Sequence, residues 1–210
     1  MLKKSRNPIL TQQRLIEATV KLVLAQGFSA TTIDQICAEA ALTKGSFFHH
    51  FKNKEAIGLA VIEWWSQMGT DLYAVAWADV DADPLDQLYA MIAIMEGFAS
   101  NPDQSCVCAI GMIAQELAGS HPEMRDRCGA ELGVWTQNVT RLLTAAKERH
   151  SPRQQFEPEE VAWFLNSLWQ GSMLVAKTQQ NQSLILHNLR QARTYINSLF
   201  FNPNPNSTLD

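Results

Sequence analysis

Residues 27–55, GFSATTIDQICAEAALTKGSFFHHFKNKE, decide the fold of this chain. Thr32 and Gln35 have the spacing of a capping box, in which the threonine hydroxyl accepts a hydrogen bond from a backbone amide and the glutamine side chain reaches back to the cap. The apolar residues that follow recur at helical spacing and predict a short helix. Thr43 is placed to cap a second short helix over 44–51. Two short helices joined by a tight turn form a helix-turn-helix, a motif whose second helix fits the major groove of DNA.

The rest of the chain is also helical in pattern. Residues 10–26 carry apolar side chains at helical spacing and end at Gly27, a residue typical of a helix C-terminus. No proline lies between residues 9 and 83, and the later prolines separate segments of helical periodicity. The further helices are expected over residues 55–77, 84–100, 105–118, 122–147, 158–180 and 183–201. We therefore expect an all-α protein of about nine helices.

Length and composition allow a small N-terminal module and one larger helical core. Of the 210 residues, 46% are hydrophobic and 18% are charged, which is the composition of a folded protein. A run of 18 apolar residues and a signal-peptide core are both absent, so we expect a cytoplasmic protein without a membrane span. We expect a DNA-binding domain over 1–54, an effector-binding and dimerisation domain over 55–202, and a disordered tail over 203–210.

Positive charge is concentrated at the N-terminus. Residues 1–54 hold eight Lys and Arg against three Asp and Glu, a net charge of +5, although the whole chain carries −4. A basic head on an acidic body can bind a polyanion while the body is repelled from it. The acidic pI of about 5.7 argues against the alternative of a nonspecific nucleic-acid binder.

The helix-turn-helix resembles that of the TetR/AcrR family of bacterial repressors. The matching residues are Gly27-Phe28, 31–36 and 42–55, within a continuous resemblance over residues 11 to about 60. The resemblance implies a homodimeric repressor that binds a palindromic double-stranded DNA operator. It also implies release from the operator when a small molecule binds or modifies the C-terminal domain.

The same resemblance assigns the residues expected to contact DNA. In this family position 48 usually carries Tyr, whose hydroxyl bonds a phosphate. Phe48 lacks this hydroxyl and can only pack against a sugar or a thymine methyl group, so it cannot make that phosphate contact. The positions that match DNA-contacting positions of the family are Thr32, Thr43, Lys44, Gly45, Ser46, Phe48, His49, His50 and Lys54.

The last two helices are the expected dimer interface. They are unusually apolar for terminal elements, and small side chains in them would let a neighbouring backbone come close. In TetR-like proteins the corresponding helix pair forms a four-helix seam between subunits. The residues expected in this interface are Phe164, Leu168, Gly171, Ser172, Ala176, Leu189 and Ile196.

Methionine and aromatic side chains of the C-terminal region are candidates for an effector cavity. Methionine is flexible and polarizable, and it is common at surfaces that accept different ligands. The alternative interpretation is that these residues are ordinary core. The candidates are Met91, Met95, Phe98, Met112, Trp135 and Trp169.

Cys106 is the candidate sensing thiol. We expect it in the first turn of the helix over 105–118, where the helix dipole favours the thiolate. Lys177, a lone cation on the penultimate helix, would be its partner. The segments around these two residues resemble a thiol-based, electrophile-sensing, NemR-like branch of the family, in which a cysteine and a lysine at these places carry the sensing. The alternative is that Cys106 is a small buried hydrophobe, and Cys108 and Cys128 show no evident activator.

An enzyme is the less favoured class. Cys106 as a nucleophile would need a base close by, and none of the histidines forms a recognisable arrangement with it. The sequence shows neither a phosphate-binding loop nor a Ser-His-Asp pattern. Four cysteines without a C-x-x-C pair predict neither a zinc site nor a disulfide framework. We therefore expect a regulator without catalytic activity, cofactor or metal.

Overall fold

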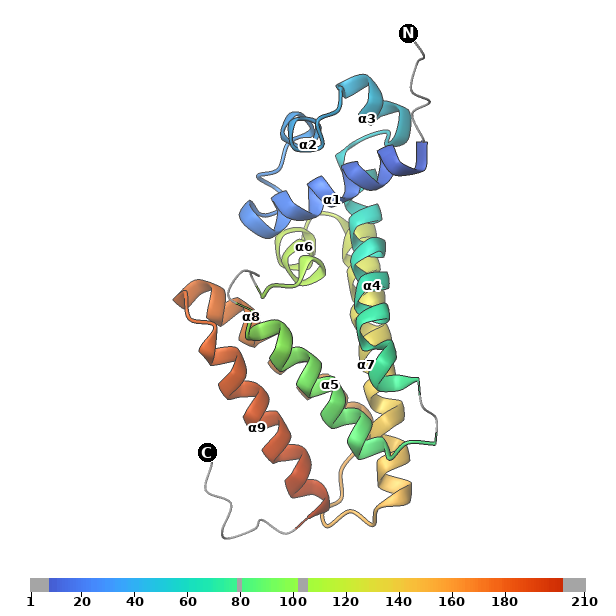
Figure 1. The fold of residues 1–210 in the computed structure, drawn as a ribbon, viewed down its shortest axis with the longest axis vertical. Helices are drawn as coiled ribbons and strands as arrows, with labels where there is room; N and C mark the ends of the chain where they lie inside the picture. The colour runs from blue at the N-terminus through green and yellow to red at the C-terminus, as the bar shows by residue number, and fades with distance from the viewer. Residues whose placement is uncertain (1–7, 79–80, 102–105, 202–210) are drawn as a thin grey trace. The chain divides into compact units, whose positions relative to one another are not determined.

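The computed structural model describes residues 8–78, 81–101 and 106–201. Within these ranges all regular structure is helical (Figure 1), so the prediction of an all-α protein of about nine helices is confirmed. The expected tail over 203–210 lies outside the described residues. The helices are α1 (Pro8–Gln26), α2 (Ile33–Glu39), α3 (Lys44–His50), α4 (Lys54–Trp77), α5 (Pro84–Ala99), α6 (Ala109–Leu117), α7 (Pro122–Arg149), α8 (Pro158–Gln179) and α9 (Ser183–Phe200).

The described chain divides into two compact units. The first holds the residues up to Gly69 together with Val107–Glu131, and the second holds Thr70–Cys106 together with the residues from Leu132 onwards. The first unit is larger than the DNA-binding domain expected over 1–54, because it also holds α6, which packs against α1, and the adjoining parts of α4 and α7. Among the helices that the structure describes, no segment qualifies as a membrane span.

The core of the first unit fixes α2 and α3 against α1 and α4. Each helix contributes one large side chain with no exposed surface: Leu15 from α1, Ile36 from α2, Phe47 from α3 and Ile57 from α4. Burying one such side chain stabilises the fold by roughly 1.5–3 kcal/mol. The helix-turn-helix is therefore held from the side opposite to its exposed face.

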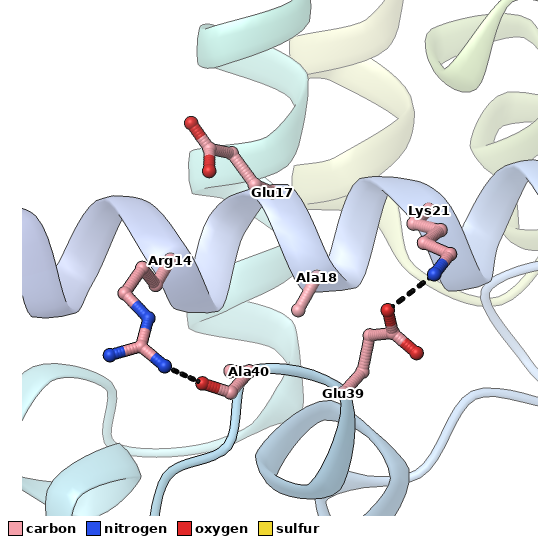
Figure 2. A pocket seen from close by; sticks show the side chains of 6 residues that line it. All are labelled: Arg14, Glu17, Ala18, Lys21, Glu39 and Ala40. Atoms are coloured by element: carbon pink, nitrogen blue, oxygen red, sulfur yellow. Dashed lines mark hydrogen bonds and ion pairs between the residues drawn. The ribbon is translucent and has the colours of Figure 1, made fainter.

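The turn between α2 and α3 depends on an alanine in a left-handed conformation. Ala41 has a φ of 50°, and the amide of Leu42 donates to the carbonyl of Cys37 at 2.8 Å. Arg14 of α1 donates from its guanidinium to the carbonyl of Ala40, the C-cap residue of α2 (Figure 2). The turn is therefore bonded to α1 as well as to its own helix.

The second unit is built on α5, α8 and α9. Helix α9 packs against both α5 and α8, and its buried aliphatic residues include Ile185, Leu189 and Ile196. Asp83 caps α5 by accepting from the Leu85 amide at 2.9 Å, and it also accepts from His150 Nε2 at 2.8 Å. Burial raises the pKa of Asp83, but the His150 and Leu85 hydrogen bonds outweigh it and the pKa is lowered.

Replacement of Ala41 by glycine tests the strain in the turn. Glycine adopts positive φ without a steric cost, so Ala41→Gly should leave the stability of the protein unchanged or raise it by about 0.5–1 kcal/mol. The matched control is Ala130→Gly at an exposed position inside α7, which should cost about 0.5–1 kcal/mol. Urea unfolding of both variants measures the difference, and equal losses would show that the turn is unstrained.

Candidate nucleic-acid interface

Thr32 begins α2 by the capping box that the sequence predicts. Its Oγ1 accepts from the Gln35 amide at 3.2 Å, and Gln35 Oε1 accepts from the Thr32 amide at 2.8 Å. Two amide groups that the start of a helix leaves unpaired are thus satisfied. The orientation of α2 is fixed at the residue where the chain enters the motif.

Helix α3 exposes most of the residues expected to contact DNA. Thr43 caps it by accepting from the Ser46 amide at 3.2 Å. Phe47 is buried, whereas its neighbour Phe48 is 53% exposed and meets it edge to face at 5.3 Å. At Gly45 an added Cβ would meet only Thr43 Oγ1, at 3.8 Å, so the surface there is open. The exposed face of α3, which comprises the cap and the helix residues that are not buried, carries Thr43, Lys44, Gly45, Ser46, Phe48, His49 and His50.

The two candidate lysines differ in their surroundings. Lys44 is exposed and forms a salt bridge of 2.7 Å with Asp34, which raises the pKa of the lysine. Lys54 instead donates to the carbonyl of Ser29 at 3.1 Å and lies 4.7 Å above the ring centroid of Phe28. Partial burial lowers the pKa of Lys54. The expected phosphate contact of Lys54 would have to compete with these two internal contacts.

A shallow groove of about 270 Å³ separates α1 from α2. Figure 2 shows two contacts across this groove: Arg14 donates to the Ala40 carbonyl, and Lys21 of α1 pairs with Glu39 of α2. These two contacts between α1 and the end of α2 therefore help to fix the position of α2. Its lining residues are Arg14, Glu17, Ala18, Lys21, Glu39 and Ala40.

A carboxylate from α6 binds the turn between α1 and α2. Glu116 Oε1 accepts from the Phe28 amide at 3.0 Å, and Oε2 accepts from the Ser29 amide at 2.6 Å. Gly27 has a φ of 89°, and a Cβ there would lie 2.3 Å from Glu116 Oε1. No local sequence pattern predicts this contact, because the two partners are 88 residues apart.

The position expected for Cys106 is wrong. Helix α6 begins at Ala109, with Cys108 as its cap, so Cys106 precedes the helix and is only 4% exposed. The Sγ of Cys108 accepts from the Gly111 amide at 3.4 Å, which places this half-buried thiol at the helix start. Cys108, for which the sequence shows no evident activator, is thus the thiol that lies next to free backbone amides at the start of α6. The first residue of the predicted helix, 105, lies outside the described residues.

The remaining effector candidates are divided between the two units. Met91 and Met95 are buried in α5, and Met112 belongs to α6 in the first unit. Phe98, Trp135 and Trp169 are half-buried in the second unit. The side chain of Lys177 is exposed in the last turn of α8. The indole N–H groups of Trp77 and Trp135 are buried without an acceptor among the described residues.

Four of the seven residues expected in the dimer interface are buried within their own chain. Ser172 donates from its hydroxyl to the Leu168 carbonyl and accepts from Asn188 Nδ2 at 2.9 Å. These four residues are buried in α8 and α9, which pack against each other, so they offer almost no surface to a partner. They are Ser172, Ala176, Leu189 and Ile196, whereas Phe164 is exposed and Leu168 and Gly171 are half-buried.

Alkylation of the cysteines tests the revised position of the reactive thiol. Cys108 should react fastest with iodoacetamide, because it is partly exposed at the start of α6. Burial raises the pKa of Cys128 to about 11, which leaves roughly 100-fold less thiolate than an ordinary thiol has. Mass spectrometry of the native protein gives the rates, and the same thiols in urea serve as the control. Fastest reaction at Cys106 would contradict this order.

The sequence is similar to those of known transcriptional regulators. Residues 15–61 match the sequence model described as bacterial regulatory proteins, tetR family, and residues 84–192 match the tetracyclin repressor-like, C-terminal domain. The chain is 27% identical over 170 residues to the transcriptional regulator AcuR of Cereibacter sphaeroides, covering 81% of this chain and 78% of AcuR. It is 24% identical over 181 residues to the transcriptional repressor NemR of Escherichia coli strain K12, covering 81% and 86%.

A solved structure shares the fold. The regulatory protein TetR from Rhodobacter sphaeroides superposes with a TM-score of 0.79 at 26% identity. The alignment covers 89% of this chain and 98% of that one. Among the described residues, no group of three His, Cys, Asp or Glu side chains could hold a metal ion.

Proposed function

The chain belongs to the TetR family of bacterial transcriptional regulators, and we propose that it is a homodimeric repressor that binds a palindromic operator and leaves it when a small molecule acts on its C-terminal region. The observation that carries this proposal is the exposed face of α3, held over the buried Phe47. In this proposal the protein acts in the cytoplasm, where the operator lies, and it has no catalytic role.

The exposed face of α3 has the side chains that operator binding requires. The Lys44 ammonium can exchange its Asp34 partner for a phosphate, which gives affinity without sequence preference. Ser46 and His49 are polar groups that can bond base edges, and Phe48 can pack on a thymine methyl group. Gly45 leaves room for the DNA backbone at the start of the helix. We keep Thr32 and Lys54 in the proposed interface as flanking contacts.

The outer face of α8 supports dimer formation. Phe164, Leu168, Gly171 and Val175 recur at spacings of four, three and four residues, so they lie on one side of the helix. Phe164 and Val175 are 46% and 48% exposed, which is unusual for large apolar side chains of a folded protein. The ring of Phe164 meets that of Tyr195 of α9 at 5.2 Å. A second copy of this face would bury this stripe and bring two DNA-binding heads into one assembly.

The effector acts on the second unit in this proposal, with Met91, Met95, Trp135 and Trp169 as the candidate lining. A covalent form of the same regulation is a second candidate. The position of Cys108 at the start of α6 favours that residue over Cys106 as the thiol that reacts. Lys177 stays a candidate partner for the effector rather than for the thiol of α6.

Removal of the Lys44 charge tests the DNA interface. A duplex is first selected by the wild-type protein from a random pool. Lys44→Ala should then weaken binding to all duplexes and lower the salt slope by about one unit, because one phosphate contact is lost. Arg125→Ala, which removes an exposed charge from α7 in the same unit, is the matched control. Equal losses in the two variants would contradict the assignment of α3 to the DNA.

A charge on the outer face of α8 tests the dimer. Phe164→Glu should dissociate the dimer, because burying an unpaired carboxylate in the interface is costly. Val134→Glu is the matched control, since Val134 is 41% exposed on α7 and should tolerate the charge. Sedimentation velocity measures both variants. A monomeric wild-type protein at micromolar concentration, or an intact Phe164→Glu dimer, would contradict the proposed interface.

A further inference from the structure

The carboxylate of Glu116 connects a helix outside the helix-turn-helix with the backbone just before α2. Each of its two oxygens accepts one amide hydrogen, from Phe28 at 3.0 Å and from Ser29 at 2.6 Å. Hydrogen bonds to an ionised group are shorter and stronger than those between neutral groups. Two parallel bonds also fix the orientation of the carboxylate relative to the turn.

The backbone around the contact is shaped to admit this side chain. Gly27 has positive φ, and a Cβ at this position would overlap Glu116 Oε1 at 2.3 Å. On the far side of the turn, Lys54 donates to the Ser29 carbonyl at 3.1 Å. The N–H of Ser29 is therefore bonded to Glu116 of α6, and the C=O of Ser29 is bonded to Lys54 of α4.

The turn passes the contact on to α2. Thr31 Oγ1 donates to the Gly27 carbonyl at 2.7 Å, and the Thr31 amide donates to the Phe28 carbonyl at 3.1 Å. The next residue, Thr32, is the cap of α2. A displacement of Glu116 must therefore either break two strong hydrogen bonds or move the start of α2.

Helix α6 begins close to one of the three points at which the chain passes between the two units; the other two lie within α4 and α7. Its cap, Cys108, follows Val107, where the chain passes from Cys106 of the second unit into the first. Glu116 stands at the opposite end of the same helix, one residue before its last residue, Leu117. A change at the start of α6 therefore reaches the turn through a single helix of nine residues.

We propose that Glu116 couples the state of α6 to the orientation of the DNA-binding helices. This inference rests on the proposed function, since it requires that the protein bind an operator. Coupling between two sites is reciprocal: if a change at α6 alters DNA binding, then DNA binding alters α6 by the same factor. The coupling can therefore be measured with DNA alone, without knowledge of the effector.

The experiment follows alkylation of Cys108 by iodoacetamide with and without the selected duplex. At low iodoacetamide concentration alkylation is slow relative to motion of α6, so its rate follows the population of the reactive state. In the wild-type protein, bound duplex should change this rate at Cys108 by about fivefold or more, the lower end of typical coupling between sites. In Glu116→Gln the side chain keeps one acceptor oxygen and presents an amide donor to the second N–H, so the effect of the duplex should fall towards one. Glu123→Gln, the same change at an exposed position in the first turn of α7, should keep the wild-type effect.

Glu116→Asp is measured in parallel, in case the amide variant fails to fold. It keeps the charge but is one methylene shorter, so it should also reduce the effect of the duplex. A wild-type effect retained in the Glu116 variants would overturn the inference, and it would reveal direct shielding of Cys108 by DNA. Bound duplex without any effect on wild-type Cys108 would overturn the coupling alone. A wild-type protein that selects no duplex would overturn the proposed function, and the coupling with it.

Discussion

A carboxylate from α6 holds two backbone amides of the turn before α2, and the placement of the DNA-facing helices depends on this contact. The free amides of a turn are ordinarily satisfied by water or by neighbouring residues. Here Glu116 satisfies those of Phe28 and Ser29 from a helix 88 residues away in the sequence. The contact requires a glycine at position 27, and the cap of α2 follows it by a few residues. One side chain thus sets the entry of the chain into the helix-turn-helix.

Other contacts also fix the positions of α2 and α3. Thr32 and Thr43 cap the two helices, and Arg14 bonds the Ala40 carbonyl where α2 ends. Phe47 is fully buried beneath α3, so the side chains on its other face point outward. These contacts give α2 and α3 a defined geometry in the free protein. A preorganised recognition helix loses little conformational entropy when it binds.

Local signals predicted most of the fold, whereas contacts between distant segments escaped the sequence. The capping box at Thr32 and the cap at Thr43 involve residues three apart, so the sequence alone identifies both. The start of α6 was misplaced because its cap is Cys108, a weak acceptor that sequence rules do not favour. Helix α8 has apolar residues on two faces, and periodicity alone cannot tell that Ser172 faces its own chain while Phe164 faces outward. The contacts of the Lys54 ammonium with the Phe28–Ser29 turn also escape the sequence, because only tertiary packing brings these residues together.

Hydrogen exchange at the amides of Phe28 and Ser29 tests the central contact most directly. Nuclear magnetic resonance of the free wild-type protein gives the two rates separately. If Glu116 holds both amides, their exchange should be slowed by at least roughly 100-fold relative to an unstructured chain, as expected for bonds that open only with the surrounding structure. Exchange at both amides within a few-fold of the unstructured rate would contradict the account.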